Sequence, residues 1–163
     1  MVLFWMCCTV LFAGCGVYSF TGASISPDVK TFSVQYFPNR AQLVQPLLSQ
    51  AFTEKLKERF ISLANLRLTD RDGDLQFEGY ISDYRTAPVA IQGTETAALN
   101  RLTISVNVKF TNTKDAKQNF ETTFTRYADY DSKKNLQDVE ISLIDDINRQ
   151  LIDDIFNKSV SNW

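Results

Sequence analysis

The sequence predicts an α+β two-layer sandwich, in which two amphipathic helices pack on one face of a mixed, mostly antiparallel sheet of four to five strands. Two observations lead to this prediction. Three long stretches alternate apolar and polar side chains with a period of two, which is typical of strands with one covered face. Two other stretches, one before and one after these strands, repeat apolar side chains at helical spacing. Two helices of this kind can cover the single apolar face of such a sheet.

Composition excludes several classes of function. The chain has 163 residues and a formal net charge of −2, with charges of both signs scattered along it, so it does not resemble a basic nucleic-acid-binding protein. It contains no histidine, which removes the commonest general base near neutral pH, the commonest metal ligand and any Ser–His or Cys–His nucleophile pair. We therefore expect neither an enzyme nor a metal site, and no cofactor beyond a covalent lipid.

The N-terminus resembles a lipoprotein leader. Residues 1–14 are apolar but far shorter than the roughly 20 residues that cross a bilayer, so they fit the apolar region of a signal peptide. The run Leu11-Phe-Ala-Gly-Cys-Gly16 places small residues before a cysteine, as lipoprotein signal peptidases require. We predict a signal peptide over residues 1–14, a lipid on Cys15, a tether over residues 15–28 and one domain over residues 29–163. The alternative for the leader is a buried N-terminal strand or helix.

The first strand and the first helix follow the tether. Residues 29–37 alternate, with Phe32, Val34 and Tyr36 on one face, and predict a strand. Residues 42–62 predict an amphipathic helix with Pro46 in its first turn, where a missing N–H costs least. Its expected apolar face consists of Leu43, Leu47, Leu48, Ala51, Phe52, Leu56 and Phe60. A helix on a membrane surface is the alternative to packing on the sheet.

A short strand at residues 66–68 runs into the acidic segment 70–74. Three aspartates of this segment fall on positions 1, 3 and 5 of a calcium-binding EF-hand loop. That loop needs glycine at position 6 and glutamate at position 12, where this chain has Leu75 and Ile81. The segment is therefore expected to be a plain hairpin turn.

Three long strands come next. They are predicted over residues 75–85, 99–110 and 120–130, with hairpin loops at 87–96 and 112–118. The first two strands have clear apolar faces. For the third, either Phe120 or Thr123 begins the inward-facing register.

A second amphipathic helix is predicted over residues 136–157. One stripe of this helix is apolar, and two pairs of aspartates lie on its opposite side. Paired carboxylates can serve acid–base or metal chemistry, but on an acid-rich helix they more often form a solvated face, which is the interpretation adopted here. The stripe consists of Val139, Leu143, Ile144, Ile147, Leu151, Ile152, Ile155 and Phe156, and the acidic pairs are Asp145-Asp146 and Asp153-Asp154.

The order of these parts resembles the LPS-assembly lipoprotein LptE family over nearly the whole chain after the leader. The family shares the lipidated cysteine with an aromatic-containing tether, then strand, helix, three long strands and a closing helix. The stretches similar to the family's strands and C-terminus are LQFEGYISDY from Leu75, NRLTISVNVKF from Asn100, FTRYADY from Phe124 and DIFNK from Asp154, ending in Asn162-Trp163.

This resemblance implies a non-enzymatic lipoprotein of the outer membrane that faces the periplasm. LptE proteins sit in the lumen of the LptD β-barrel, help to assemble and plug it, and assist delivery of lipopolysaccharide to the cell surface. Gly16 after the lipidated cysteine is consistent with outer-membrane retention, because aspartate there is the usual inner-membrane signal. The implied partners are an LptD-like barrel, lipopolysaccharide and, through the lipid, the membrane. Another periplasm-facing lipoprotein scaffold or transport accessory protein with the same fold is the alternative.

In a meander the 87–96 hairpin and the 131–135 loop emerge at the same end of the sheet. Arg85, Arg101, Lys133 and Lys134 flank this end, where they could contact the phosphates of lipid A. The competing interpretation is that these are ordinary solubilising surface charges.

Overall fold

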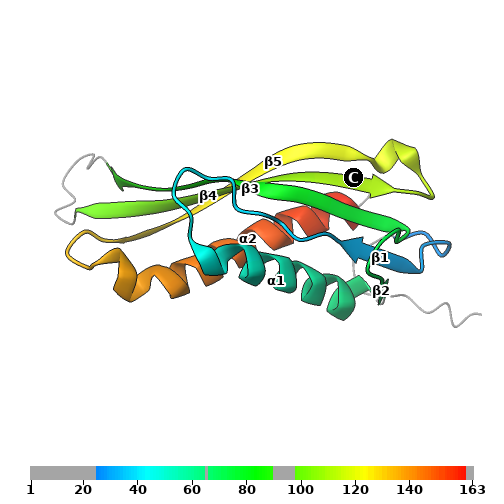
Figure 1. Ribbon diagram of the computed structural model, residues 1–163, viewed down its shortest axis with the longest axis horizontal. Helices are drawn as coiled ribbons and strands as arrows, with labels where there is room; N and C mark the ends of the chain where they lie inside the picture. The colour runs from blue at the N-terminus through cyan, green and yellow to red at the C-terminus, as the bar shows by residue number, and fades with distance from the viewer. Residues whose placement is uncertain (1–24, 65, 90–97, 161–163) are drawn as a thin grey trace, which may run out of the picture.

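The computed structural model describes residues 25–64, 66–89 and 98–160. A sheet forms one layer and two helices the other (Figure 1). In chain order the elements are β1 (Thr31–Val34), α1 (Pro46–Ala64), β2 (Arg67–Leu68), β3 (Leu75–Val89), β4 (Leu99–Asn112), the 3₁₀ helix η1 (Ala116–Gln118), β5 (Phe120–Asp131) and α2 (Leu136–Val160). The predicted α+β sandwich is confirmed.

The sheet has five strands in the order β2-β1-β3-β4-β5. The β1 strand pairs in parallel with both β2 and β3, whereas β3, β4 and β5 form an antiparallel meander. The mixed, mostly antiparallel sheet predicted from the sequence is therefore present, and the short strand β2 belongs to it as an edge.

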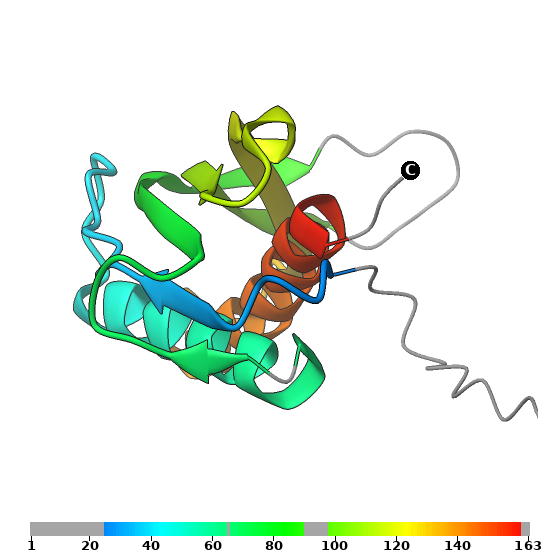
Figure 2. The same cartoon turned by 90° about the vertical axis from the view of Figure 1, so that its right-hand side faces the viewer.

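Both helices pack on the same face of this sheet and run in the same direction (Figures 1 and 2). The apolar residues of β4 and the stripe of α2 are buried as predicted, and in β5 the register that begins at Phe120 faces the helices. Aromatic rings connect the two layers, since Phe60 of α1 packs on Phe77 of β3 and on Phe156 of α2. Burial of these faces is the main favourable term for folding.

The first strand is shorter than predicted. β1 ends at Val34, and Tyr36, expected on the inward face, is 61% exposed. Phe37 is fully buried instead and packs edge-on against Phe52 of α1. The alternation fails because the chain leaves the extended sheet register just before Pro38, so the inward position moves by one residue.

The helix α1 begins later than predicted, at Pro46. Leu43 therefore precedes the helix and is 57% exposed, and Leu47 is 63% exposed although it was assigned to the apolar face. Proline at the first helical position is well tolerated because the amide there has no intrahelical partner. The remaining apolar positions pack inward, and Leu48, Phe52, Leu56 and Phe60 are fully buried.

The sequence predicts a plain hairpin turn at residues 70–74. This prediction is wrong, because the segment 69–74 does not join two neighbouring strands. The strands β2 and β3 do not pair with each other, because β1 lies between them and pairs with both. The segment crosses the outer face of β1 so closely that a Cβ atom on Gly73 would lie 2.5 Å from the carbonyl carbon of Phe32. Only glycine permits this approach. The amide of Gly73 in turn donates to Ser33 Oγ at 3.3 Å.

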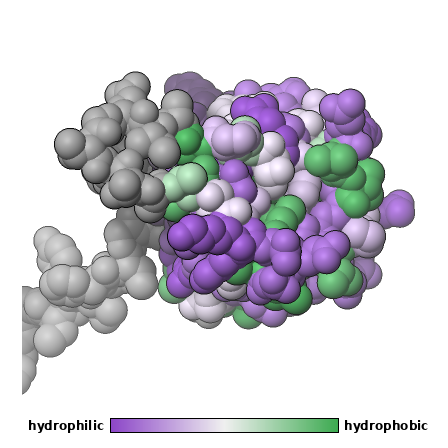
Figure 3. All heavy atoms as spheres, turned by 90° about the vertical axis from the view of Figure 1, so that its left-hand side faces the viewer, coloured by the Kyte–Doolittle hydropathy of each residue, from purple (hydrophilic) through white to green (hydrophobic). Residues whose placement is uncertain are grey.

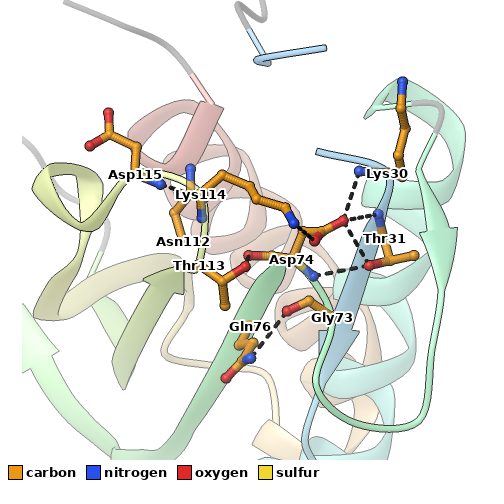
Figure 4. A network of polar contacts seen from close by, with 9 residues as sticks. All are labelled: Lys30, Thr31, Gly73, Asp74, Gln76, Asn112, Thr113, Lys114 and Asp115. Carbon is orange, nitrogen blue, oxygen red and sulfur yellow. Dashed lines mark hydrogen bonds and ion pairs between the residues drawn. The ribbon is translucent and has the colours of Figure 1, made fainter. Parts of the chain in front are cut away.

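Asp74 fixes this crossover to β1 (Figure 4). Its Oδ2 accepts hydrogen bonds from the backbone amides of Lys30 and Thr31 at 2.9 and 3.0 Å and from Thr31 Oγ1 at 3.0 Å. Lys114, from the β4–β5 connection, lies 3.0 Å from Asp74 Oδ1. The Lys30 amide, followed by Lys114 and Thr31, lowers the pKa of Asp74 far below its usual value. These oxygens are occupied by donors within the protein.

The paired aspartates of α2 lie on a solvated face, as predicted, since Asp145, Asp146 and Asp153 are 51%, 55% and 44% exposed, but three of the four also pair with cations of other elements. Asp145 pairs with Lys55 of α1, Asp153 with Arg59 of α1, and Asp154 with Arg126 of β5 through two hydrogen bonds of 2.6 and 2.7 Å. They therefore fasten α2 to α1 and to the free edge of the sheet. The sequence shows these charges but not their partners, because the partners lie far away along the chain.

Candidate functional site

One end of the domain collects the side chains that the sequence singled out. There Val89, Leu99 and Asp131 lie side by side in the sheet, and the turn at residues 131–135 leads into α2. Both helices begin toward this end (Figure 1). We call it the loop end. Ile25 lies at the other end of the sandwich, next to the last turn of α2 (Figures 1 and 2).

Arg101 is held rigidly on the outer face of the sheet. Its guanidinium donates two hydrogen bonds to Asp129, at 2.7 and 2.9 Å, and lies 3.6 Å from the ring centre of Tyr127. The hydrogen bond to Asp129 raises the pKa of Arg101, and the same contact lowers the pKa of Asp129. A carboxylate and an aromatic ring thus fix the arginine in a planar arrangement.

Arg85 lies on the same face of the sheet. It is opposite Thr103 in the β3–β4 register, and Thr103 is two residues from Arg101, so the two arginines are diagonal neighbours. The side chain of Arg85 is 64% exposed, and its Nη1 lies 2.5 Å from Asp83. An exposed pair of this kind breaks at little cost, which leaves Arg85 available to a ligand.

Lys133 and Lys134 occupy the turn between β5 and α2. Their backbone amides donate to the Asp131 carboxylate at 2.9 Å and to the Asp131 carbonyl at 3.0 Å. Both side chains are exposed, and neither lies in an ion pair with any carboxylate in the part of the chain that the structure describes. The four predicted cations are thus at one end, but the arginines lie on the sheet and the lysines on the turn.

An apolar surface that was not predicted from the sequence is formed by the loop before α1 and the first turns of both helices. Leu43, Val44, Leu47 and Ile141 are 57%, 64%, 63% and 77% exposed. Hydrophobic spheres lie among hydrophilic ones on this end of the molecule (Figure 3). Proline at the first helical position was the signal that could have placed Leu43 outside the buried face.

A polar junction holds the starts of both helices against the sheet. Glu140 of α2 accepts hydrogen bonds from the Tyr84 hydroxyl of β3 and, at 3.2 Å, from Gln45 just before α1. Tyr84 is buried below a bulge in β3 between Ile81 and Asp83, and this burial, together with Glu140, raises the pKa of its phenol. Three elements distant in sequence thus meet behind the loop end.

The arrangement favours binding. This end of the domain carries both cations for phosphate and exposed apolar side chains, a combination suited to an amphipathic anion. Among the described residues, no group of three or more His, Cys, Asp or Glu side chains could hold a metal ion. None of the helices in that part of the chain combines the length and apolarity needed to cross a bilayer. The predicted leader and Cys15 lie outside the described residues.

Comparison with known proteins points to one family. The family model described as "LptE: Lipopolysaccharide-assembly" matches residues 29–159. No curated protein gives a significant match.

Several solved structures share the fold at low identity. A minor lipoprotein of Acinetobacter baumannii is 15% identical over 81% of this chain and 96% of its own, with a TM-score of 0.51. The hypothetical protein CT253 of Chlamydia trachomatis is 13% identical over 82% and 99%, with a TM-score of 0.52. Protein XCC0632 of Xanthomonas campestris is 8% identical over 85% and 90%, with a TM-score of 0.54. These likenesses show the fold alone.

Proposed function

This chain belongs to the LptE family of lipopolysaccharide-assembly proteins, and from that premise we propose that it assembles with an LptD-like outer-membrane β-barrel, plugs it and assists insertion of lipopolysaccharide at the cell surface. It acts by binding rather than by catalysis. We further propose that a lipid on Cys15 anchors it to the outer membrane with the domain facing the periplasm. The family match over residues 29–159 is the observation that carries this proposal.

The arrangement of the two ends supports the proposal. Ile25, the first described residue of the proposed tether, lies next to the last turn of α2, at the end of the sandwich opposite to the loop end (Figure 1). A lipid attached upstream of it would place the loop end away from the anchoring point. The cations that would meet lipopolysaccharide would then be directed into the barrel rather than toward the domain's own anchor.

The chemistry of the loop end also fits this ligand. Lipid A carries phosphates and acyl chains, and the loop end offers exposed lysine and arginine side chains together with exposed leucine, valine and isoleucine. Arg101 can form two parallel hydrogen bonds to a phosphate only if it gives up its two hydrogen bonds to Asp129. Lys133 and Lys134 can attract a phosphate as point charges without breaking an existing ion pair. We therefore expect the two lysines to contribute most to the initial contact.

The test is purification of the tagged full chain from outer membranes in mild detergent, with intact-mass analysis of its N-terminus. A lipidated Cys15 and a large β-barrel recovered in equal amounts are the expected results. A lipidated protein recovered without a barrel would refute the barrel assignment and favour another envelope lipoprotein scaffold. An unprocessed Met1 would refute the lipid anchor.

A further inference from the structure

A narrow groove lies between the first turns of α1 and α2. It has a volume of about 180 Å³, and its apolar walls include Leu47 and Ala51 of α1 and Ile141 and Ile144 of α2. Leu47 and Ile141 at its rim are 63% and 77% exposed. Large side chains so exposed on neighbouring helices form an apolar surface that water solvates poorly.

Polar links between the two sides bracket the groove. Gln45 donates to Glu140 at 3.2 Å at one end, and Lys55 pairs with Asp145 at the other. The Lys55 ammonium lowers the pKa of Asp145, so this pair stays charged at neutral pH. The Lys55–Asp145 charges cancel, whereas the Glu140 carboxylate at the other end is bonded to the neutral side chains of Gln45 and Tyr84. An anionic ligand therefore finds no unpaired cation among the residues that line the groove.

Asn148 in the wall of the groove has no partner. Its side chain is fully buried, and neither Nδ2 nor Oδ1 makes a hydrogen bond with any residue that the structure describes. Leaving a buried amide donor and acceptor unsatisfied is costly, and most such groups in folded proteins are paired. A leucine at this position would pack without that cost.

We propose that this groove is a docking site for an extended peptide segment of a protein partner. One large apolar side chain of the segment fills the groove between Leu47 and Ile141, and a neighbouring peptide group pairs with Asn148. An asparagine amide offers one donor side and one acceptor side, which is what a peptide group offers in return. Gln45 and Lys55, long side chains at the two ends, move aside to admit the segment and to uncover the Asn148 amide, which is fully buried without it.

The unpaired amide distinguishes a peptide from other occupants. An acyl chain would fill the apolar volume but leave both polar atoms of Asn148 unsatisfied. A phosphate would meet apolar walls, a paired lysine and the carboxylate of Glu140. Leu43 and Val44, which directly precede Gln45 in the chain, are also more than half exposed and offer an extended segment further apolar contact area.

The test uses residues 16–163, which lack the predicted leader and Cys15 but include every described residue, in detergent-free buffer. N-acetyl-L-leucinamide, which combines one leucine side chain with two peptide groups, is titrated while amide resonances are followed by NMR. We expect saturable shifts of the Asn148 side-chain amide and of the amides of Leu47, Ala51 and Ile141. 1-Hexanol, which has an apolar chain and no peptide group, is expected to bind about fivefold or more weakly.

Three variants test the assignment. Asn148→Leu is expected to weaken binding of N-acetyl-L-leucinamide by about fivefold to tenfold and to remove its advantage over 1-hexanol. Ile141→Ser, at an exposed rim position that does not support the core, is also expected to weaken binding. Ile61→Ser is the matched control, because Ile61 is 51% exposed on α1 and does not line the groove.

Several outcomes would overturn the proposal. Equal binding of 1-hexanol, unaffected by Asn148→Leu, would mean that the groove takes acyl chains. Shifts of the same residues with protein concentration alone would mean that a second copy covers it. No shift up to the solubility limit of the probe would mean that the groove is closed. Because the test involves no barrel or lipopolysaccharide, its failure and that of the proposed function are distinguishable.

Discussion

Replacing Asp74 by alanine is expected to lower the free energy of unfolding by about 3 kcal/mol. The substitution removes three hydrogen bonds from Lys30 and Thr31 and the ion pair with Lys114. Hydrogen bonds to a charged group contribute about 1.5–3 kcal/mol each when well buried, and less when water can replace them. The Lys30 amide is exposed and the Lys114 side chain is 44% exposed, so their shares are small and the Thr31 contacts dominate.

The loss of unfolding free energy in Asp74→Ala also depends on pH. The donors that surround Asp74 keep its pKa in the folded protein far below 3.8, its ordinary value. The ionised carboxylate therefore stabilises the folded state fully above pH values of about 5, and this contribution declines as the pH falls from the ordinary pKa toward the lower pKa of the folded protein. The difference in stability between the native chain and Asp74→Ala should accordingly be largest near pH 6 and shrink steadily toward pH 2.

Thermal unfolding followed by circular dichroism measures both effects. For a domain of this size, about 3 kcal/mol corresponds to a fall in Tm of roughly 10 °C at pH 6. Asp70→Ala is the matched control, because Asp70 is an exposed aspartate of the same crossover segment, and it should change Tm by less than about 2 °C. An equal effect of the two substitutions, or a difference for Asp74→Ala at pH 2 as large as that at pH 6, would refute the reasoning.

Three further variants have defined outcomes. Gly73→Ala should lower the unfolding free energy by about 2–4 kcal/mol in urea titrations, because the new Cβ would overlap the backbone of Phe32; an unchanged midpoint would refute the close crossing. Asn148→Leu should raise Tm by several degrees, because it removes a buried unsatisfied amide, whereas a lower Tm would mean that the amide is paired. Lys133→Glu combined with Lys134→Glu should weaken binding of purified lipopolysaccharide by about tenfold at low salt without changing Tm; unchanged binding would remove these lysines from the site.

The periodic parts of the fold could be predicted from the sequence. The β4 strand alternates without interruption because one face is buried and the other exposed, and α2 shows a continuous apolar stripe. The two-layer arrangement follows from these patterns alone. The same signal weakens wherever an element is short or incompletely covered.

The strand order and the exposed apolar surface could not be predicted. Two-residue β2 has no usable period, and its place beside β1 depends on the crossing at Gly73, which is a tertiary contact. Leu47 has the spacing of a core residue, but neither the sheet nor α2 covers it. The partners of the α2 carboxylates could not be predicted either, since Asp145 pairs with a lysine 90 residues away. Periodicity shows which faces are apolar but not which of them will be covered.

The most direct test of the proposed function is site-specific photo-crosslinking to lipopolysaccharide in living cells. A benzoylphenylalanine at position 134 probes the loop end, and one at position 117 probes an equally exposed position in η1, at the opposite end of the sheet. We predict a lipopolysaccharide adduct at position 134 and none at position 117. An adduct at position 117 alone, or none at either position in cells that transport lipopolysaccharide, would contradict the assignment of the loop end as the contact surface.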